Sequence, residues 1–115
     1  MNTKSKNKIS DSISNLSKKQ NLQKLLFESY QYIEENYFNE LNLSKIASKS
    51  FLSEFHFHRL FKAQFGFTPK EFLILIRNEK VIHLLLNTQV SIADISFEVG
   101  FENTETMIRS FKKHF

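Results

Sequence analysis

Two segments of the chain repeat one pattern, and this repeat constrains the fold more than any other feature. Residues 46–65 read IASKSFLSEFHFHRLFKAQF, and residues 95–115 read ISFEVGFENTETMIRSFKKHF. In each copy an isoleucine is followed by a small residue, and a large apolar residue stands six positions after the isoleucine. The Arg-x-Phe-Lys motif that begins at Arg59 then returns at Arg109. The repeat predicts two similar units, each with a short helix, a tight turn and a longer helix.

Apolar residues at helical spacing and capping residues predict where the other helices lie. The expected helices include one at about 22–37, a short one capped by Ser44, and others over 53–66, 68–87, 91–100 and 103–115. Thr68 with Glu71 and Ser91 with Asp94 are capping boxes, and Gly66 suits a left-handed helix end. Ile9, Ile13 and Leu16 also have helical spacing, with a weaker signal. The prediction is an all-α fold of seven helices without strands.

The composition limits the classes of function that the chain can have. The sequence has no cysteine, so neither a disulfide framework nor a thiolate metal site is available. We find no Gly-rich phosphate loop and no pair of carboxylates that converges by spacing, so the prediction is a protein that is not an enzyme and needs no cofactor. The N-terminus lacks the apolar core of a secretory signal, and no apolar run has membrane-spanning length. A cytoplasmic protein without membrane contact is expected.

The net charge of +4 comes from the first twenty residues. Residues 1–20 carry five Lys and one Asp, whereas residues 21–115 carry eleven Lys and Arg against eleven Asp and Glu. Residues 1–20 are also rich in Ser and Asn and poor in large apolar groups, which is typical of a mobile arm. Any binding of an anion by the remaining residues therefore depends on where the charges lie.

The two longer helices of the repeat each separate an apolar face from a polar one. At about 100° per residue, the apolar faces carry Phe57, Leu60, Phe61 and Phe65 in the first copy and Met107, Ile108, Phe111 and Phe115 in the second. The opposite faces carry Phe55, His58, Arg59 and Lys62 in the first copy and Glu105, Thr106, Arg109 and Lys113 in the second. Arg, His and Phe can contact bases, and Lys suits phosphate. These faces predict two helices that enter DNA major grooves.

A metal site and ordinary surface residues are the alternatives for these side chains. His56 and His58 diverge by about 200° on a helix, whereas metal pairs need a spacing of three or four residues. Phe55 could also pack against a neighbouring helix, and Arg59 and Arg109 could be solvated surface residues. Three glutamates lie at the helix starts: Glu54, Glu102 and Glu105. Their carboxylates interact favourably with the helix dipole but repel phosphate. The matching positions of the two arginines favour contact with DNA.

The helix over 69–87 connects a first helix-turn-helix unit, residues 21–68, to a second, residues 88–115. Its length of about 18 residues corresponds to roughly 27 Å. One turn of DNA is about 34 Å, so the two polar faces are expected to reach successive major grooves of a double strand.

The chain resembles the DNA-binding domain of AraC/XylS-type transcription regulators over about residues 22–115. The segments RLFKAQFGFTPKEFL, SIADISFEVGF and RSFKKHF carry the resemblance. Many members have His-Phe or Tyr-Phe at the positions of Thr106-Met107. In this respect the sequence is more similar to the small stand-alone regulators of the MarA, SoxS and Rob type. That likeness implies base contacts by Phe55, His58 and Arg59 in the first unit and by Thr104, Glu105, Thr106 and Arg109 in the second. The sequence departs from the family pattern at Ile108 and Glu105. It also lacks the Gly-x-x-Pro segment that usually follows the last helix.

The resulting hypothesis is a sequence-specific regulator of transcription that binds double-stranded DNA as a monomer. Arg59 and Arg109 are the main base readers, while Lys62, Lys112 and Lys113 hold phosphates. The rival hypothesis is a protein-interaction module that docks on RNA polymerase or on another regulator and binds DNA weakly. A third is that the chain is the DNA-binding part of a longer regulator.

Overall fold

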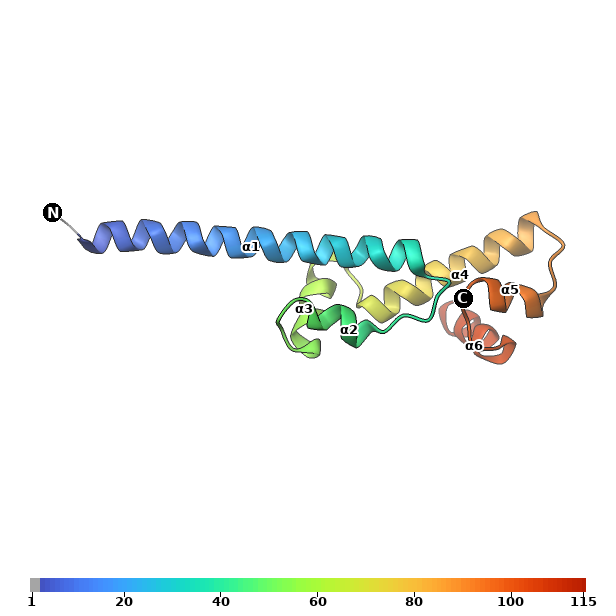
Figure 1. Cartoon of the computed structure of the whole chain (residues 1–115). Coiled ribbons are helices and arrows are strands. Elements are labelled where there is room, and N and C mark those ends of the chain that lie inside the picture. The colour runs from blue at the N-terminus through green and yellow to red at the C-terminus, as the bar shows by residue number, and fades with distance from the viewer. Residues whose placement is uncertain (1–2) are drawn as a thin grey trace.

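The computed structural model describes the backbone of residues 3–115, with the side chains of residue 12 and residues 17–115. This part of the chain forms six α-helices and no strand (Figure 1). They are α1 (Thr3–Asn36), α2 (Leu43–Ser48), α3 (Glu54–Phe65), α4 (Pro69–Asn87), α5 (Ile92–Glu98) and α6 (Thr104–His114). The all-α prediction is confirmed.

The predicted number of seven helices is wrong, and so is the start of the first long helix. The helix α1 begins at Thr3 rather than near Leu22 and continues to Asn36. The sequence between these residues has no Gly or Pro that would end a helix, so one helix reaches into the predicted arm. The side chains of the arm lysines Lys4, Lys6 and Lys8 lie outside the described residues.

Side chains cap the five shorter helices, mostly as predicted. Ser53, Thr68 and Ser91 are confirmed as the N-caps of α3, α4 and α5, and Asn103 is the N-cap of α6. Each accepts from a backbone N–H three residues later. The N-cap of α2 is Asn42 and not Ser44, because the Asn42 Oδ1 atom lies 3.0 Å from the Lys45 backbone nitrogen. Gly66 ends α3 with φ of 89°, in the predicted left-handed conformation.

Two hydrophobic cores lie at the two ends of α4. The first contains residues from α1 to α4: Leu26, Ile33, Ile46, Ala47, Phe57, Phe61, Phe72, Leu73 and Ile76. The second contains Val81, Ile95, Val99, Phe101 and Met107. The repeat explains this arrangement, since the equivalent pairs Ile46-Ala47 and Ile95-Ser96 are all buried. The helix α4 therefore connects two helix-turn-helix units, each with its own core.

Some of the predicted apolar faces are only partly buried. Phe57, Phe61 and Met107 are in the cores, but Ile108 is 41% exposed and Phe115 is 72% exposed. Ile108 directly follows Met107, and the 100° between successive residues turns it away from the core. Phe115 comes after the last residue of α6, and the centre of its ring lies 4.7 Å from that of Phe111. Both residues are corrections to the predicted core.

Candidate nucleic-acid interface

The outward face of α3 is set by the burial of its inward face. Phe57 and Phe61 are fully buried, which fixes the rotation of the helix about its axis. The opposite side then presents four side chains, which we call the first contact face: Phe55, His58, Arg59 and Lys62. Phe55 is 72% exposed, and Arg59 and Lys62 are also exposed. The alternative that Phe55 packs against a neighbouring helix is therefore wrong.

Arg59 and Phe55 form a pair on this face. The guanidinium carbon of Arg59 lies 5.7 Å from the centre of the Phe55 ring, within the range of a cation–π interaction. The ion pairs among the described residues involve Lys24, His58 and Lys62 and neither Arg59 nor Arg109. The Arg59 guanidinium thus has a planar support on one side and N–H donors that no carboxylate occupies.

His58 and Lys62 are less available than Arg59. The side chain of His58 is only 28% exposed, and its Nε2 atom lies 4.0 Å from a Glu54 carboxylate oxygen. That nitrogen is also buried without a hydrogen-bond partner among the described residues. The Lys62 ammonium lies 3.9 Å from a Glu71 carboxylate oxygen, in an exposed ion pair. Such pairs contribute at most about 1 kcal/mol, so phosphate can compete for the lysine.

The second contact face comprises Thr104, Glu105, Thr106, Arg109, Lys112 and Lys113 on α6. Glu105, Arg109 and the two lysines are exposed. The two threonines are half-buried and already have partners. The Thr106 hydroxyl donates to Asn103 Oδ1 at 2.9 Å, and the Thr104 hydroxyl lies 3.4 Å from that of Ser96. Thr104 therefore lies at the edge of the core, where helical geometry places it.

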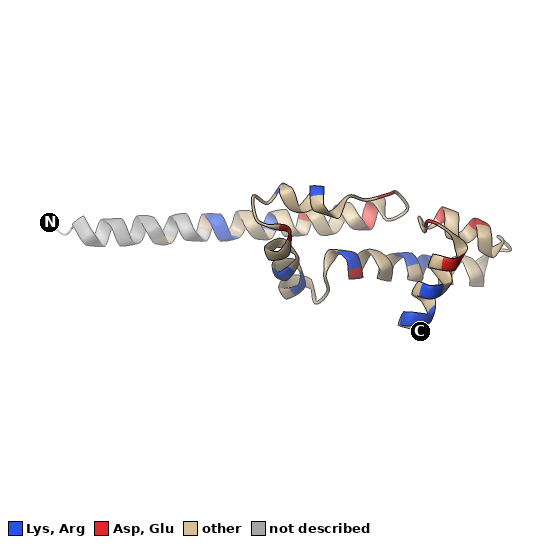
Figure 2. Ribbon diagram, turned by 90° about the horizontal axis from the view of Figure 1, so that it is seen from below, with Lys and Arg blue, Asp and Glu red and all other residues tan. Residues whose placement is uncertain are grey.

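The helices that carry the two contact faces lie on the same side of α1. In Figure 1, α3 and α6 both lie below α1, and α6 also lies below the second half of α4. Figure 2 views this side, where α3 lies at the N-terminal end of α4 and α6 crosses the C-terminal half of α4. Lys and Arg occur on both helices, and those of α6 gather toward its C-terminal end. One extended ligand on this side of the molecule can therefore reach both helices.

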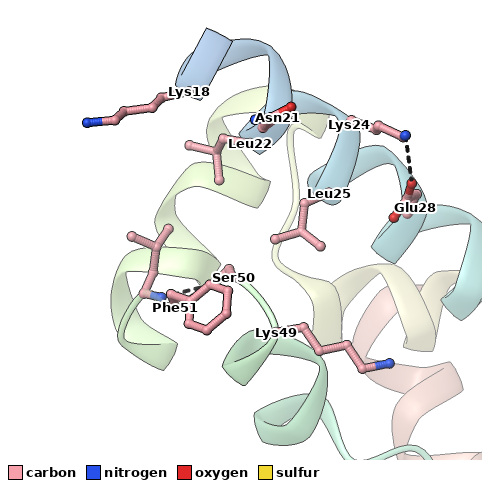
Figure 3. Close-up of a pocket in the computed structure, with 10 residues that line it drawn as sticks. Lys18, Asn21, Leu22, Lys24, Leu25, Glu28, Lys49, Ser50 and Phe51 are labelled. Carbon is pink, nitrogen blue, oxygen red and sulfur yellow. Dashed lines mark hydrogen bonds and ion pairs between the residues drawn. The ribbon is translucent and has the colours of Figure 1, made fainter. Parts of the chain in front are cut away.

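An open groove of about 770 Å³ lies between α1 and the turn from α2 to α3, and none of the predicted contact residues lines it. Figure 3 shows Leu22, Leu25 and Phe51 in this groove, with Lys18 and Lys49 among the surrounding side chains. The groove is therefore separate from both contact faces.

The described part of the chain has neither a candidate metal site nor a helix that could span a membrane. No group of three or more His, Asp or Glu side chains there could hold a metal ion. None of the helices described is both long and apolar enough to cross a membrane.

Two notable residues were missed by the sequence reasoning. Phe51 is 97% exposed and has φ of 60°, which is rare for a residue other than glycine. Arg77 is half-buried in α4 and donates two hydrogen bonds to backbone carbonyls. A signal for Arg77 existed, because it lies four residues from the buried Leu73 and Val81 and interrupts their apolar stripe.

Comparison with known proteins adds the family. Residues 46–115 match the family model described as a helix-turn-helix domain. The lactose operon transcription activator of Staphylococcus xylosus is 33% identical over 84 residues, which are 73% of this chain and 30% of that protein. The chain thus spans less than a third of the length of that curated relative.

Solved structures agree with this assignment. A transcriptional regulator from Chromobacterium violaceum, described as containing an AraC-type DNA-binding domain, has a TM-score of 0.68 and 28% identity. The match covers 81% of this chain and 83% of that one. The DNA-binding domain of AdpA, solved with its target DNA, has a TM-score of 0.71 at 21% identity and covers 78% and 81% of the two chains, which shows the shared fold. With two helix-turn-helix units around one connecting helix, the chain belongs to the AraC-type helix-turn-helix family.

Proposed function

We propose that this chain binds double-stranded DNA in a sequence-specific manner and regulates transcription. The observation that carries the proposal is the pair of exposed arginines, Arg59 and Arg109, at equivalent positions of two repeated helices, α3 and α6. These two helices lie on the same side of α1 (Figure 1). The AraC-type relatives support it, since they include a transcription activator and a protein with a DNA-binding domain.

The length of the connecting helix is of the same order as the distance between successive major grooves. The connecting helix α4 has 19 residues, which corresponds to about 28 Å. The two grooves that a double helix shows on one side are about 34 Å apart. One chain supplies both helices, so the chain acts as a monomer in this proposal, in the cytoplasm and without a catalytic step.

Each contact residue has a role that follows from its chemistry. Arg59 and Arg109 donate to guanine O6 and N7, the commonest specific contact in the major groove. Phe55 contacts a thymine methyl group, and Glu105 accepts from a cytosine amino group. His58, Thr104 and Thr106 are assisting contacts, because their polar atoms are partly committed within the protein. Lys62, Lys112 and Lys113 bind phosphates, which gives affinity and orientation without sequence preference.

A substitution of Arg59 tests this assignment. Arg59→Ala is expected to weaken binding to the cognate site by about 1–3 kcal/mol and to relax the base preference at one position. Fluorescence anisotropy with cognate and random duplexes at one salt concentration measures both effects. Lys62→Ala is the matched control, because loss of a phosphate contact weakens binding to both duplexes alike. An equal loss on both duplexes for Arg59→Ala would show that Arg59 only neutralises phosphate.

The lysine-rich residues 1–20 add affinity that depends on salt. Deleting them is expected to reduce the slope of log affinity against log salt, because fewer counterions are released from the DNA. An unchanged slope would remove these residues from the proposal. A chain that binds purified RNA polymerase but none of the duplexes would instead support the docking alternative.

A further inference from the structure

Arg77 joins the connecting helix to the chain segment that follows α1. Its Nε atom donates to the Tyr37 carbonyl oxygen at 2.8 Å, and its Nη2 atom donates to the Asn39 carbonyl oxygen at 3.0 Å. The two acceptors are 40 and 38 residues away in the sequence. The guanidinium therefore holds both ends of the 37–39 turn against α4.

The surroundings of Arg77 show that this contact is costly to form. Burial lowers the pKa of the Arg77 guanidinium. The ion pairs of the described residues do not include Arg77, so carbonyl oxygens rather than a carboxylate stabilise its charge. A desolvated cation needs such hydrogen bonds, and a planar guanidinium supplies two in a fixed geometry.

The same turn is in close contact with the second unit. A Cβ atom at Gly100 would lie 2.8 Å from the Tyr37 carbonyl oxygen and 2.9 Å from that of Phe38. Gly100 precedes Phe101, whose ring lies 5.7 Å below the Arg77 guanidinium carbon. The 37–39 turn is thus clamped between α4 on one side and the α5–α6 turn on the other.

Tyr37 connects the two cores through this clamp. It packs against both hydrophobic clusters, and the Lys80 ammonium lies 5.7 Å from the centre of its ring. A cavity of about 500 Å³ next to the clamp is lined by Glu40, Arg77, Gly100 and Thr106, among others. The space beside the turn is therefore open, and specific contacts rather than complete packing hold the two units together.

We propose that Arg77 is a positioning residue that fixes the orientation of the two contact faces, and thereby sets the distance between DNA half-sites that the protein accepts. The statement about half-sites rests on the proposed function, whereas the statement about orientation does not. Without the hydrogen bonds of Arg77, the two units would be related only by α4 and by the packing around Tyr37. The second unit would then turn against the first, and a wider range of half-site distances would be bound with lower affinity.

Distance measurement between two spin labels tests the orientation directly. The chain has no cysteine, so Ala63→Cys on α3 and Ile108→Cys on α6 provide the only two labelling sites. Both positions are exposed, and neither belongs to a contact face. The labelled full chain is expected to give one narrow distance distribution in the absence of DNA.

Three substitutions on α4 are compared in this labelled chain. Arg77→Met removes both hydrogen bonds and is expected to broaden the distribution to about twice its width. Arg77→Lys keeps a positive charge but cannot form the fork of two hydrogen bonds, and an intermediate width is expected. Lys70→Met is the matched control, since it removes an exposed cation from the same helix. Circular dichroism checks that each variant is folded. If Arg77→Met does not fold, the comparison with Arg77→Lys decides. An unchanged width in a folded Arg77 variant would overturn the proposal.

Binding to duplexes with varied half-site distance then separates this proposal from the proposed function. Arg77→Met is expected to lose about tenfold in affinity at the best distance and to discriminate less between distances. Binding to one half-site should not change. If Arg77→Met broadens the distance distribution but the parent chain binds no duplex, the DNA-binding proposal is contradicted and the positioning role of Arg77 is supported. If both folded Arg77 variants discriminate between half-site distances as strongly as the parent chain does, the positioning role is contradicted and DNA binding is unaffected.

Discussion

The Arg59 guanidinium carbon lies 5.7 Å from the centre of the Phe55 ring, one helical turn earlier on the same exposed face of α3. A solvent-exposed pair of this kind contributes about 0.5–1 kcal/mol. The ring limits the positions that the long arginine side chain can adopt, so part of the ordering cost of base recognition is met before DNA binds. On the first contact face, the Phe55 ring therefore supports Arg59 in a restricted set of positions.

Phe55→Ala is expected to weaken binding to the cognate duplex by roughly tenfold, about 1.4 kcal/mol. The loss combines the support of Arg59 with the contact to a thymine methyl group. Phe51→Ala is the matched control, because Phe51 is also highly exposed but lies outside both contact faces. Fluorescence anisotropy measures both variants. Equal losses in the two variants would mean that exposed aromatic area, and not the Arg59–Phe55 pair, contributes the affinity.

Phe51→Gly is expected to raise the free energy of unfolding by about 0.5–1 kcal/mol, because glycine adopts φ of 60° without the steric cost that Phe51 carries. The 97% exposed ring has almost no burial to lose. Urea unfolding followed by circular dichroism measures the change. Phe51→Ala keeps the strain and should give no gain, so equal stabilisation by both substitutions would contradict this explanation.

Gly100→Ala and Gly66→Ala separate backbone strain from steric contact. The two glycines have nearly the same φ, 95° and 89°, but a Cβ atom would meet nothing within 4 Å at Gly66 and two carbonyl oxygens within 3.0 Å at Gly100. We expect Gly66→Ala to destabilise the protein by about 1 kcal/mol and Gly100→Ala by about 3 kcal/mol. Urea unfolding of both variants gives the comparison. Equal losses would show that the 37–39 turn moves freely away from Gly100.

Asn42→Ala is expected to destabilise the protein by about 1 kcal/mol, because it removes the side chain that caps α2. Ser44→Ala should change the free energy of unfolding by less than about 0.5 kcal/mol, since Ser44 lies inside the first turn of the helix. Thermal or urea unfolding of the two variants checks this pair. A larger effect of Ser44→Ala than of Asn42→Ala would show that Ser44 is the N-cap, as the sequence predicted.

The local features of the fold were predictable from the sequence, because they depend on neighbouring residues. Thr68-Pro69 begins a helix and Gly66 ends one for reasons contained in a few positions. The repeat also located Arg59 and Arg109 on outward faces. The N-cap of α2 was misplaced because Asn42 and Ser44 are both good capping residues, and the choice depends on the entry of the chain from α1.

The relation between the two units was not predictable, because it depends on contacts between distant residues. The bonds from Arg77 to the 37–39 turn span about forty positions, and an arginine inside an apolar stripe does not reveal its acceptors. The reduced exposure of His58 and the commitment of the Thr106 hydroxyl to Asn103 also came only from the structure. Helical periodicity assigns residues to a face, but it does not say which polar atoms of that face are already bonded.

The most direct measurement is the selection of bound duplexes from a random DNA library, with the parent chain and with Arg109→Ala. The parent should enrich a site with two short half-sites, each with a preferred guanine and with centres about 10–10.5 base pairs apart. Arg109→Ala should retain the preference in one half-site and lose the guanine in the other. Two results would contradict the proposal that the protein reads DNA with two equivalent helices. One is the enrichment of a single half-site that Arg109→Ala leaves unchanged, and the other is no enrichment over random sequence.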